Sequence, residues 1–173
     1  MIIGLGNFDF MGKSGQSAIA LGSNLGDSRA ILKSSLKILD QTPGISLLAQ
    51  SSFYRTAPIG PPQPDYLNGC ALLKAEMSPQ ELLEKLLAIE AKFGRVRQER
   101  WGPRILDLDL ILFDNLILET PNLTLPHPGL RERAFVLVPL AEIAPNWIDP
   151  ISEKAIAQLV QEVDCSGVTK IEN

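Results

Sequence analysis

Residues 100–109 read Arg-Trp-Gly-Pro-Arg-Ile-Leu-Asp-Leu-Asp, and this short run largely decides the fold predicted for the chain. Side chains alternate between the two faces of an extended strand, so Asp107 and Asp109 point the same way, roughly 7 Å apart. Leucines at 106, 108, 110 and 112 point the other way and indicate burial in a hydrophobic core. The run therefore predicts a strand over residues 105–113 with two carboxylates on one face.

These carboxylates and the basic residues before them indicate a particular chemistry. Two carboxylates on one strand face repel each other unless cations or arginines compensate their charge. Carboxylate oxygens suit Mg²⁺, which completes its coordination shell with water and substrate phosphates. Arg100 and Arg104 lie just upstream and can bind phosphate oxygens with their planar guanidinium groups. The pattern is typical of a site that binds a nucleotide and transfers a phosphoryl group.

The composition predicts a globular protein with neither a membrane nor a nucleic-acid partner. The chain has 173 residues, 45% of them hydrophobic, and a formal net charge of −4. An acidic chain lacks the basic face from which general nucleic-acid binders gain affinity. No apolar stretch approaches the about 20 residues that span a membrane, and the first residues do not resemble a signal peptide. We therefore expect a cytoplasmic monomer in which Cys70 and Cys165 are free thiols.

Periodicity and turn signals divide the chain into an N-terminal extension, residues 1–16, and one domain, residues 17–173. Asp27 and Ser78 stand at helix N-cap positions, and Pro79 follows Ser78 at the first position of its helix. Pro139 and Pro145 are expected to break the apolar run after Phe135 into short pieces. The predicted strands are 17–22, 45–54, 66–76, 105–113 and a hairpin partner at 116–118, and the predicted helices run from 27 to before Pro43, from 79 to Gly94 and over 152–163.

The order β-α-β-β-α-β, followed by C-terminal additions, predicts an α+β fold. We expect a ferredoxin-like antiparallel sheet with helices packed on one face. Fold alone does not give function, because one fold can carry many kinds of site.

Several side chains outside the acidic strand are also candidates for ligand binding, although each has a plain structural explanation. Gly22 lies in a Gly-rich turn and allows a ligand to approach the backbone, but ordinary turns use the same residues. Tyr66 and Asn68 share a strand face and could stack on a flat ring and read its polar edge, with Phe135 as a second stacking surface. His127 is the only histidine. It lacks partners for a transition-metal site and is better suited to donate to a phosphate.

Taken together, these residues are similar to the 6-hydroxymethyl-7,8-dihydropterin pyrophosphokinase family of folate biosynthesis, over about residues 18–145. Arg100-Trp-Gly-Pro-Arg104 followed by Asp107-Leu-Asp109 is the most specific part of the resemblance. The other matching segments are Leu21-Gly-Ser-Asn-Leu25, Ser52-Phe-Tyr-Arg-Thr56, Gln63-Pro-Asp-Tyr-Leu-Asn68, Gly94-Arg-Val-Arg97, Pro126-His127 and Arg133-Ala-Phe135.

The resemblance implies transfer of the diphosphoryl group of ATP to the hydroxymethyl oxygen of the dihydropterin, with release of AMP. It implies that Asp107 and Asp109 hold two Mg²⁺ ions and that Arg95 and Arg104 act on the phosphates as catalytic residues. The implied ATP contacts are Glu90, Arg95, Arg104, Leu110, Thr124, His127 and Arg133. The implied pterin contacts are Gly22, Thr56, Ile59, Tyr66, Asn68, Trp101 and Phe135.

Two other functions stay open at this point. Another two-metal transferase on a similar sheet would share the carboxylates but release pyrophosphate or ADP. A ferredoxin-like RNA-binding module would carry exposed aromatic residues on the sheet and a net positive charge, whereas this chain is acidic.

Overall fold

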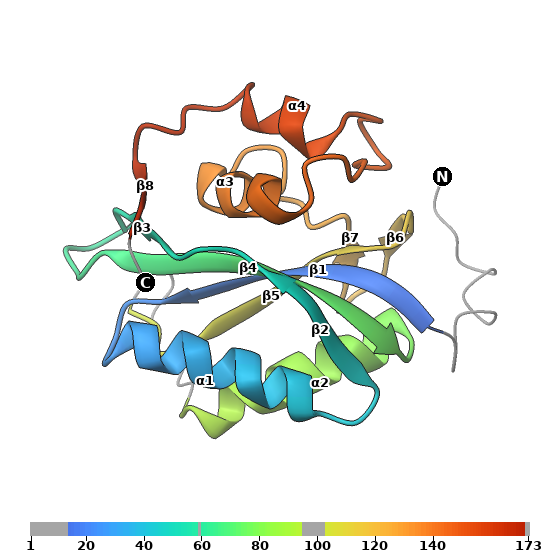
Figure 1. Cartoon of the computed structure of the whole chain (residues 1–173), viewed down its shortest axis with the longest axis horizontal. Coiled ribbons are helices and arrows are strands. Elements are labelled where there is room, and N and C mark those ends of the chain that lie inside the picture. The colour runs from blue at the N-terminus through green and yellow to red at the C-terminus, as the bar shows by residue number, and fades with distance from the viewer. Residues whose placement is uncertain (1–13, 59, 95–102, 172–173) are drawn as a thin grey trace.

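The computed structural model describes residues 14–58, 60–94 and 103–171, and these form helical layers on both sides of a central sheet (Figure 1). The helices α1 and α2 cover one face, while α3 and α4 lie against the other. The elements are β1 (Ser14–Ser23), α1 (Ser28–Gln41), β2 (Ile45–Gln50), β3 (Tyr54–Thr56), β4 (Tyr66–Glu76), α2 (Pro79–Lys92), β5 (Asp107–Phe113), β6 (Leu118–Glu119), β7 (Thr124–Leu125), α3 (Ala134–Ile143), α4 (Ile156–Val160) and β8 (Val168–Lys170).

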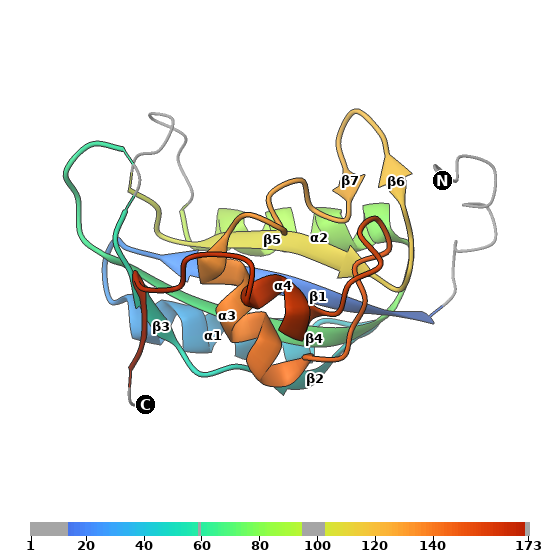
Figure 2. The ribbon, with the colours of Figure 1, turned by 90° about the horizontal axis from the view of Figure 1, so that it is seen from above.

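The main sheet is antiparallel and has the strand order β5-β1-β4-β3-β8, with β2 also paired to β4. The order β5-β1-β4-β2 is that of the split β-α-β, ferredoxin-like arrangement. This confirms the predicted fold class. In Figure 2, the end of β1, the loop between β3 and β4 and the start of β5 lie at the same end of the molecule.

Local sequence signals account for the first two helices. The side chain of Asp27 accepts a hydrogen bond from the Ala30 N–H and so caps α1, as predicted. Ser78 and Glu81 form a capping box at the start of α2, with Pro79 as the first helical residue. Leucines at helical spacing then bury one stripe of each helix against the sheet, including Leu32 and Leu36 of α1 and Leu82 and Leu86 of α2.

The two helices of the predicted β-α-β-β-α-β order lie on one face as expected, and the C-terminal additions α3 and α4 bury a second apolar cluster on the opposite face, which was not predicted. Leu137 and Leu140 of α3 and Ile156 of α4 pack with Ile111 of β5 in this cluster. Pro139 does not break the run, since it lies inside α3. A proline in a helix interior removes one hydrogen bond and clashes with the preceding turn. The burial of apolar side chains around Pro139 offsets that cost here.

Four other boundaries differ from the prediction. Strand β1 begins at Ser14 because residues 14–16 continue the ladder with β4, so the proposed division after residue 16 falls inside this strand. The strand predicted over 45–54 is interrupted, since Ser51 bonds to Cys70 through both its N–H and its hydroxyl. Strand β6 pairs with β7 rather than with β5. The last helix is only Ile156–Val160, because Glu153 has a φ of 62°, outside the right-handed helical region.

Candidate active site

Two adjoining pockets meet at Asp109. The first, of about 590 Å³, lies on the α3 face between the end of β1, the start of β4 and the start of β5. The second, of about 770 Å³, lies between α2, β5 and residues 121–128. Asp109 lines both pockets. Because β5 ends the order of the main sheet, the second pocket runs along its outer edge.

Small residues on β1 leave room above the two carboxylates. Asp107 is paired with Gly22, and Asp109 with Ala20. Both carboxylates are half-buried, whereas the alternating Leu108 and Leu110 are fully buried. The predicted alternation is therefore confirmed for residues 106–110, and it places two acid side chains on the floor of the first pocket. It is wrong for Leu112, which packs with the cluster on the α3 face because the register with β1 shifts after Leu110.

Asn68 and Tyr66 form a wall of the first pocket. The Thr56 hydroxyl donates to Oδ1 of Asn68 at 2.6 Å, which fixes the orientation of the amide. A methyl group placed on Gly22 would lie 3.0 Å from Nδ2 of Asn68 and 3.6 Å from a ring carbon of Tyr66. Gly22 is thus needed for the close approach of these side chains across the β1–β4 ladder.

Arginines from two segments complete the first pocket. Arg104 precedes β5, and Arg133 precedes α3 and lies 5.8 Å from the centroid of the Phe135 ring. A guanidinium at that distance from an aromatic face makes a cation–π interaction. The pKa of Tyr66 is raised by burial and by the nearby Asp107 charge, while Arg104 partly opposes the shift. The pocket combines aromatic faces, an oriented amide and opposite charges.

Glu90 and His127 contribute polar groups to the second pocket. Glu90 is only 2% exposed, and its carboxylate accepts a hydrogen bond from the Leu108 N–H at 2.7 Å. Nδ1 of His127 accepts from the Gly129 N–H at 3.0 Å, so Nε2 carries the proton when the ring is neutral. Burial lowers the pKa of His127, the Asp109 carboxylate opposes that shift, and Arg133 adds to it. A neutral ring that donates through Nε2 suits hydrogen bonding to an anionic ligand.

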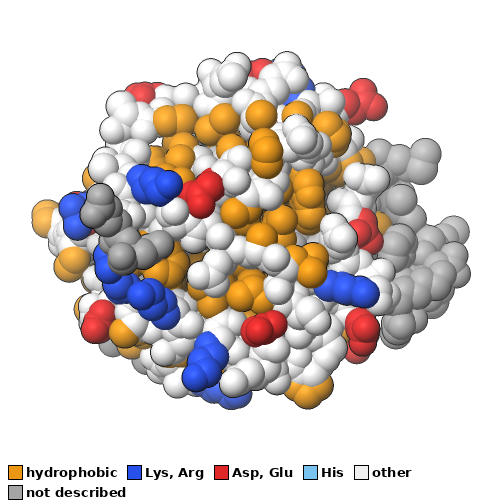
Figure 3. Space-filling view, in the orientation of Figure 1, with side chains coloured by type: hydrophobic (Ala, Val, Ile, Leu, Met, Phe, Trp, Pro, Cys, Tyr) orange, Lys and Arg blue, Asp and Glu red, His pale blue; other side chains and the backbone are white. Residues whose placement is uncertain are grey.

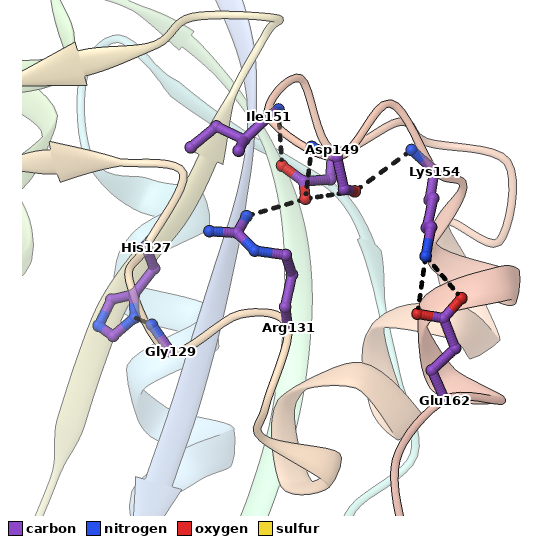
Figure 4. Close-up of polar contacts among 8 residues, drawn as sticks. His127, Gly129, Arg131, Asp149, Ile151, Lys154 and Glu162 are labelled. Carbon is purple, nitrogen blue, oxygen red and sulfur yellow. Dashed lines mark hydrogen bonds and ion pairs between the residues drawn. The ribbon is translucent and has the colours of Figure 1, made fainter.

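The loop between β7 and α3, which carries His127 and Arg133, is bonded to a residue of the segment that follows α3. Arg131 makes an ion pair of 2.9 Å with Asp149, a residue that is fully buried (Figure 4). Burial alone would raise the pKa of Asp149, but hydrogen bonds from Ser152 and Ile151 and the charge of Arg131 lower it below the ordinary value. The ion pair between Lys154 and Glu162 in the same view is exposed. Of these two ion pairs, the Arg131–Asp149 pair is the one that joins this loop to the segment beyond α3.

The structure divides the predicted site residues between the two pockets. Gly22, Thr56, Tyr66, Asn68, Arg104, Asp107, Arg133 and Phe135 line the first, Glu90, Leu110, Thr124 and His127 line the second, and Asp109 lines both. Arg104 and Arg133 were expected at ATP and lie in the pocket with the residues expected at the pterin. Ile59, Arg95 and Trp101 lie outside the described residues.

Sequence reasoning missed further residues at the site. Glu132 lines the first pocket, and Gln80 and Leu87 line the second. Asn24, which bonds to Gln63 and to Arg104, lies within the matching segment 21–25 but was given no role. Only Asn24 had a signal that could have been used, because it stands in the Gly-rich turn after Gly22.

In the part of the chain that the structure describes, no group of three or more His, Cys, Asp or Glu side chains could hold a metal ion. A cation at Asp107 and Asp109 would therefore need further ligands from a substrate or from water. No described helix is long and apolar enough to cross a membrane.

Comparisons with known proteins agree on one family. The family model described as 7,8-dihydro-6-hydroxymethylpterin-pyrophosphokinase matches residues 18–145. A Synechocystis protein named 2-amino-4-hydroxy-6-hydroxymethyldihydropteridine pyrophosphokinase is 51% identical over 160 residues, which cover 92% of this chain and 82% of that protein. A Methylorubrum extorquens protein of the same name is 43% identical and covers 89% of this chain and 97% of its own length.

A crystal structure of Plasmodium falciparum HPPK-DHPS with pteroate has a TM-score of 0.70 and 12% identity. The aligned region covers 87% of this chain but only 42% of that longer chain. At this identity the likeness supports the α+β fold alone.

Proposed function

The chain belongs to the 7,8-dihydro-6-hydroxymethylpterin-pyrophosphokinase family, and we propose that its two adjoining pockets hold the two substrates of that enzyme side by side. The reaction is the ATP-dependent transfer of a diphosphoryl group to 6-hydroxymethyl-7,8-dihydropterin in folate biosynthesis. The observation that carries the arrangement is that Asp109 lines both pockets. A group passed from one substrate to the other would cross at this residue.

The first pocket suits the pterin. Tyr66 and Phe135 offer aromatic faces for the flat ring, and Nδ2 of Asn68, held in orientation by Thr56, offers a donor to its polar edge. The second pocket suits the nucleoside and the α-phosphate, with Glu90, Leu110, Thr124 and His127 around them. Arg104 and Arg133 line the first pocket, which supports contact with the β- and γ-phosphates as these reach toward the pterin.

The transfer needs positioning and charge neutralisation more than a protein nucleophile. The hydroxymethyl oxygen bonds to the β-phosphorus, and the bond from that phosphorus to the oxygen bridging to the α-phosphate breaks. AMP leaves with the bridging oxygen, and the hydroxyl proton passes to water. Arg104 and Arg133 would neutralise charge on the diphosphoryl group, and Tyr66 and Phe135 would orient the ring.

Asp107 and Asp109 are suited to hold Mg²⁺. They lie on one strand face opposite small residues, are half-buried and offer only oxygen atoms. Two Mg²⁺ ions bound there together with ATP would withdraw negative charge from the phosphates. Arg95 and Trp101 are kept as proposed contacts to phosphate and pterin, and Ile59 as a proposed pterin contact, on the family resemblance alone.

We also propose a monomer in the cytoplasm. Cys70 and Cys165 are free thiols, which agrees with a reducing compartment. The exposed large apolar side chains among the described residues lie on four separate segments, at Leu25, Leu48, Leu87 and the turn with Ile148 and Ile151, which does not suggest one large interface. Light scattering of the purified protein would test the monomer.

The RNA-binding alternative is disfavoured because helices lie against both faces of the sheet, and the pocket that opens on the α3 face has two carboxylates on its floor, which would repel a phosphate backbone. On the face shown in Figure 3, Lys and Arg side chains lie in separate small groups among acidic and apolar ones.

A product assay with ATP, Mg²⁺ and 6-hydroxymethyl-7,8-dihydropterin tests the proposed reaction. Equal amounts of AMP and pterin diphosphate support it, while pyrophosphate or ADP would favour another two-metal transferase.

A further inference from the structure

Asn24, the first residue after β1, forms a closed hydrogen-bonded pair with Arg104. The Asn24 N–H donates to the Arg104 carbonyl oxygen at 3.0 Å, and the Arg104 N–H donates to Oδ1 of Asn24 at 2.8 Å. Asn24 is 3% exposed, so these bonds are shielded from water. The end of β1 is thereby joined to the residue that places a guanidinium in the first pocket.

The same side chain holds a third segment. Nδ2 of Asn24 donates to Oε1 of Gln63 at 2.8 Å and to the Pro64 carbonyl oxygen at 2.9 Å. Pro64 lies two residues before Tyr66, where β4 begins. One buried side-chain amide therefore uses both of its hydrogens and its oxygen. It connects the end of β1 to the segment before β4 and to the segment before β5. A buried amide that is bonded in this way resists reorientation, because any rotation leaves polar groups unpaired.

We infer that Asn24 is a positioning residue, which fixes Arg104 relative to the wall formed by Tyr66 and Asn68. This inference rests on the proposed placement of the pterin in the first pocket. Arg104 and the wall formed by Tyr66 and Asn68 come from segments that are distant in the sequence. Transfer requires the phosphate bound by Arg104 to meet the hydroxyl of the pterin bound at that wall. A misplacement of about 1 Å can lower a reaction rate on the order of 10²-fold.

Three substitutions remove different sets of the hydrogen bonds made by Asn24. Asn24→Asp keeps the acceptor for the Arg104 N–H but turns a carboxylate oxygen toward the acceptors on Gln63 and Pro64. Asn24→Ala removes all three side-chain bonds and adds no buried charge, so it remains informative if the aspartate variant fails to fold. Gln63→Ala removes one of the bonds from the other side. Asn146→Ala, at an exposed position between α3 and α4, is the matched control.

Steady-state kinetics and hydrogen–deuterium exchange of the full chain provide two independent measurements. We expect kcat of Asn24→Ala, measured well below its melting temperature, to fall at least about tenfold. The melting temperature should fall as well, because the Arg104 N–H is left unpaired, while the Kd of a non-hydrolysable ATP analogue should stay near that of Asn146→Ala. Gln63→Ala should lower kcat in the wild-type background and have little further effect in Asn24→Ala, because both substitutions remove the same bond. Peptides covering residues 60–66 and 103–106 should lose exchange protection together in Asn24→Ala.

An Asn24→Ala protein with wild-type kcat, or with protection lost in only one of the two segments, would overturn the inference. The exchange measurement does not depend on catalysis. Absence of AMP from the wild-type enzyme would therefore count against the proposed function, while separate loss of protection would count against the role of Asn24.

Discussion

The close approach at Gly22 predicts that Gly22→Ala selectively weakens pterin binding. The added methyl would lie 3.0 Å from Nδ2 of Asn68, so one of the two groups must move by about 0.5 Å to reach an ordinary contact distance. Asn68 cannot simply turn aside, because its oxygen is bonded to the Thr56 hydroxyl. The methyl also enters the pocket beside Tyr66, where the ring is proposed to stack.

The size of the effect follows from these two contacts. Loss of one hydrogen bond from Asn68 costs about 1 kcal/mol, and the steric overlap costs about 1–2 kcal/mol more. The sum of about 2–3 kcal/mol corresponds to a rise of about 30- to 150-fold in the Kd of the pterin. The folded state should lose less, because replacing glycine lowers the entropy of the unfolded chain and offsets about 0.4–1 kcal/mol of the strain.

Equilibrium titration of each substrate checks this selectivity. The Kd of the pterin should rise while that of an ATP analogue with Mg²⁺ changes less than about threefold, since Gly22 does not line the second pocket. Gly167→Ala is the control, because a methyl there would meet no atom within 4 Å. An unchanged pterin Kd, or an equal loss for both ligands, would refute the assignment of the first pocket to the pterin.

Four further predictions follow from the site and its supports. Asp107→Ala and Asp109→Ala should each lower kcat on the order of 10²–10³-fold without changing the circular dichroism spectrum, and an active Asp109→Ala enzyme would remove that residue from the mechanism. Mg²⁺ alone should leave the melting temperature unchanged, while Mg²⁺ with an ATP analogue should raise it, because the described residues add no third acidic or imidazole group to the pair. Glu90→Ala should lower the unfolding free energy by about 1–3 kcal/mol by leaving the Leu108 N–H unpaired, and Glu90→Gln should lower it less; urea titration compares them. Since the folded pKa of Asp149 lies below its unfolded value, its stabilisation is complete above about pH 5 and is lost as pH falls through the folded pKa. The stability difference between wild type and Asp149→Asn should therefore shrink in acid, and a constant difference would contradict this.

The parts of the fold that the sequence predicts are those governed by local rules. The alternation of Asp107, Leu108 and Asp109 and the caps at Asp27 and Ser78 depend on neighbouring residues, and the structure has them as expected. Helix α3 was missed because Pro139 is unfavourable locally, and only tertiary burial of the surrounding apolar residues makes the helix stable. The pairing of β6 with β7 depends on a partner that local pattern does not specify.

In the candidate site, too, local sequence rules predict some residues, while tertiary contacts decide the placement of the others. Asp107 and Asp109 could be identified from spacing, and most of the other residues required the family resemblance. Their distribution between two pockets could not be predicted, since it depends on which side of β5 each segment reaches. The burial of Glu90 could not be predicted either, since its carboxylate accepts a hydrogen bond from Leu108 in β5, a contact that local pattern does not specify.

The ion pair between Arg131 and Asp149 indicates that the part of the chain needed for activity extends beyond the family match. The family match ends at residue 145, and every described residue proposed to touch substrate lies before that point. Asp149 lies beyond it and holds the loop that carries His127 and Arg133. A fragment cut at the boundary of the family match would keep the described substrate contacts and lose part of their support. The segment after α3 is therefore a poor place for a cut or an inserted domain, although it contains none of the proposed substrate contacts.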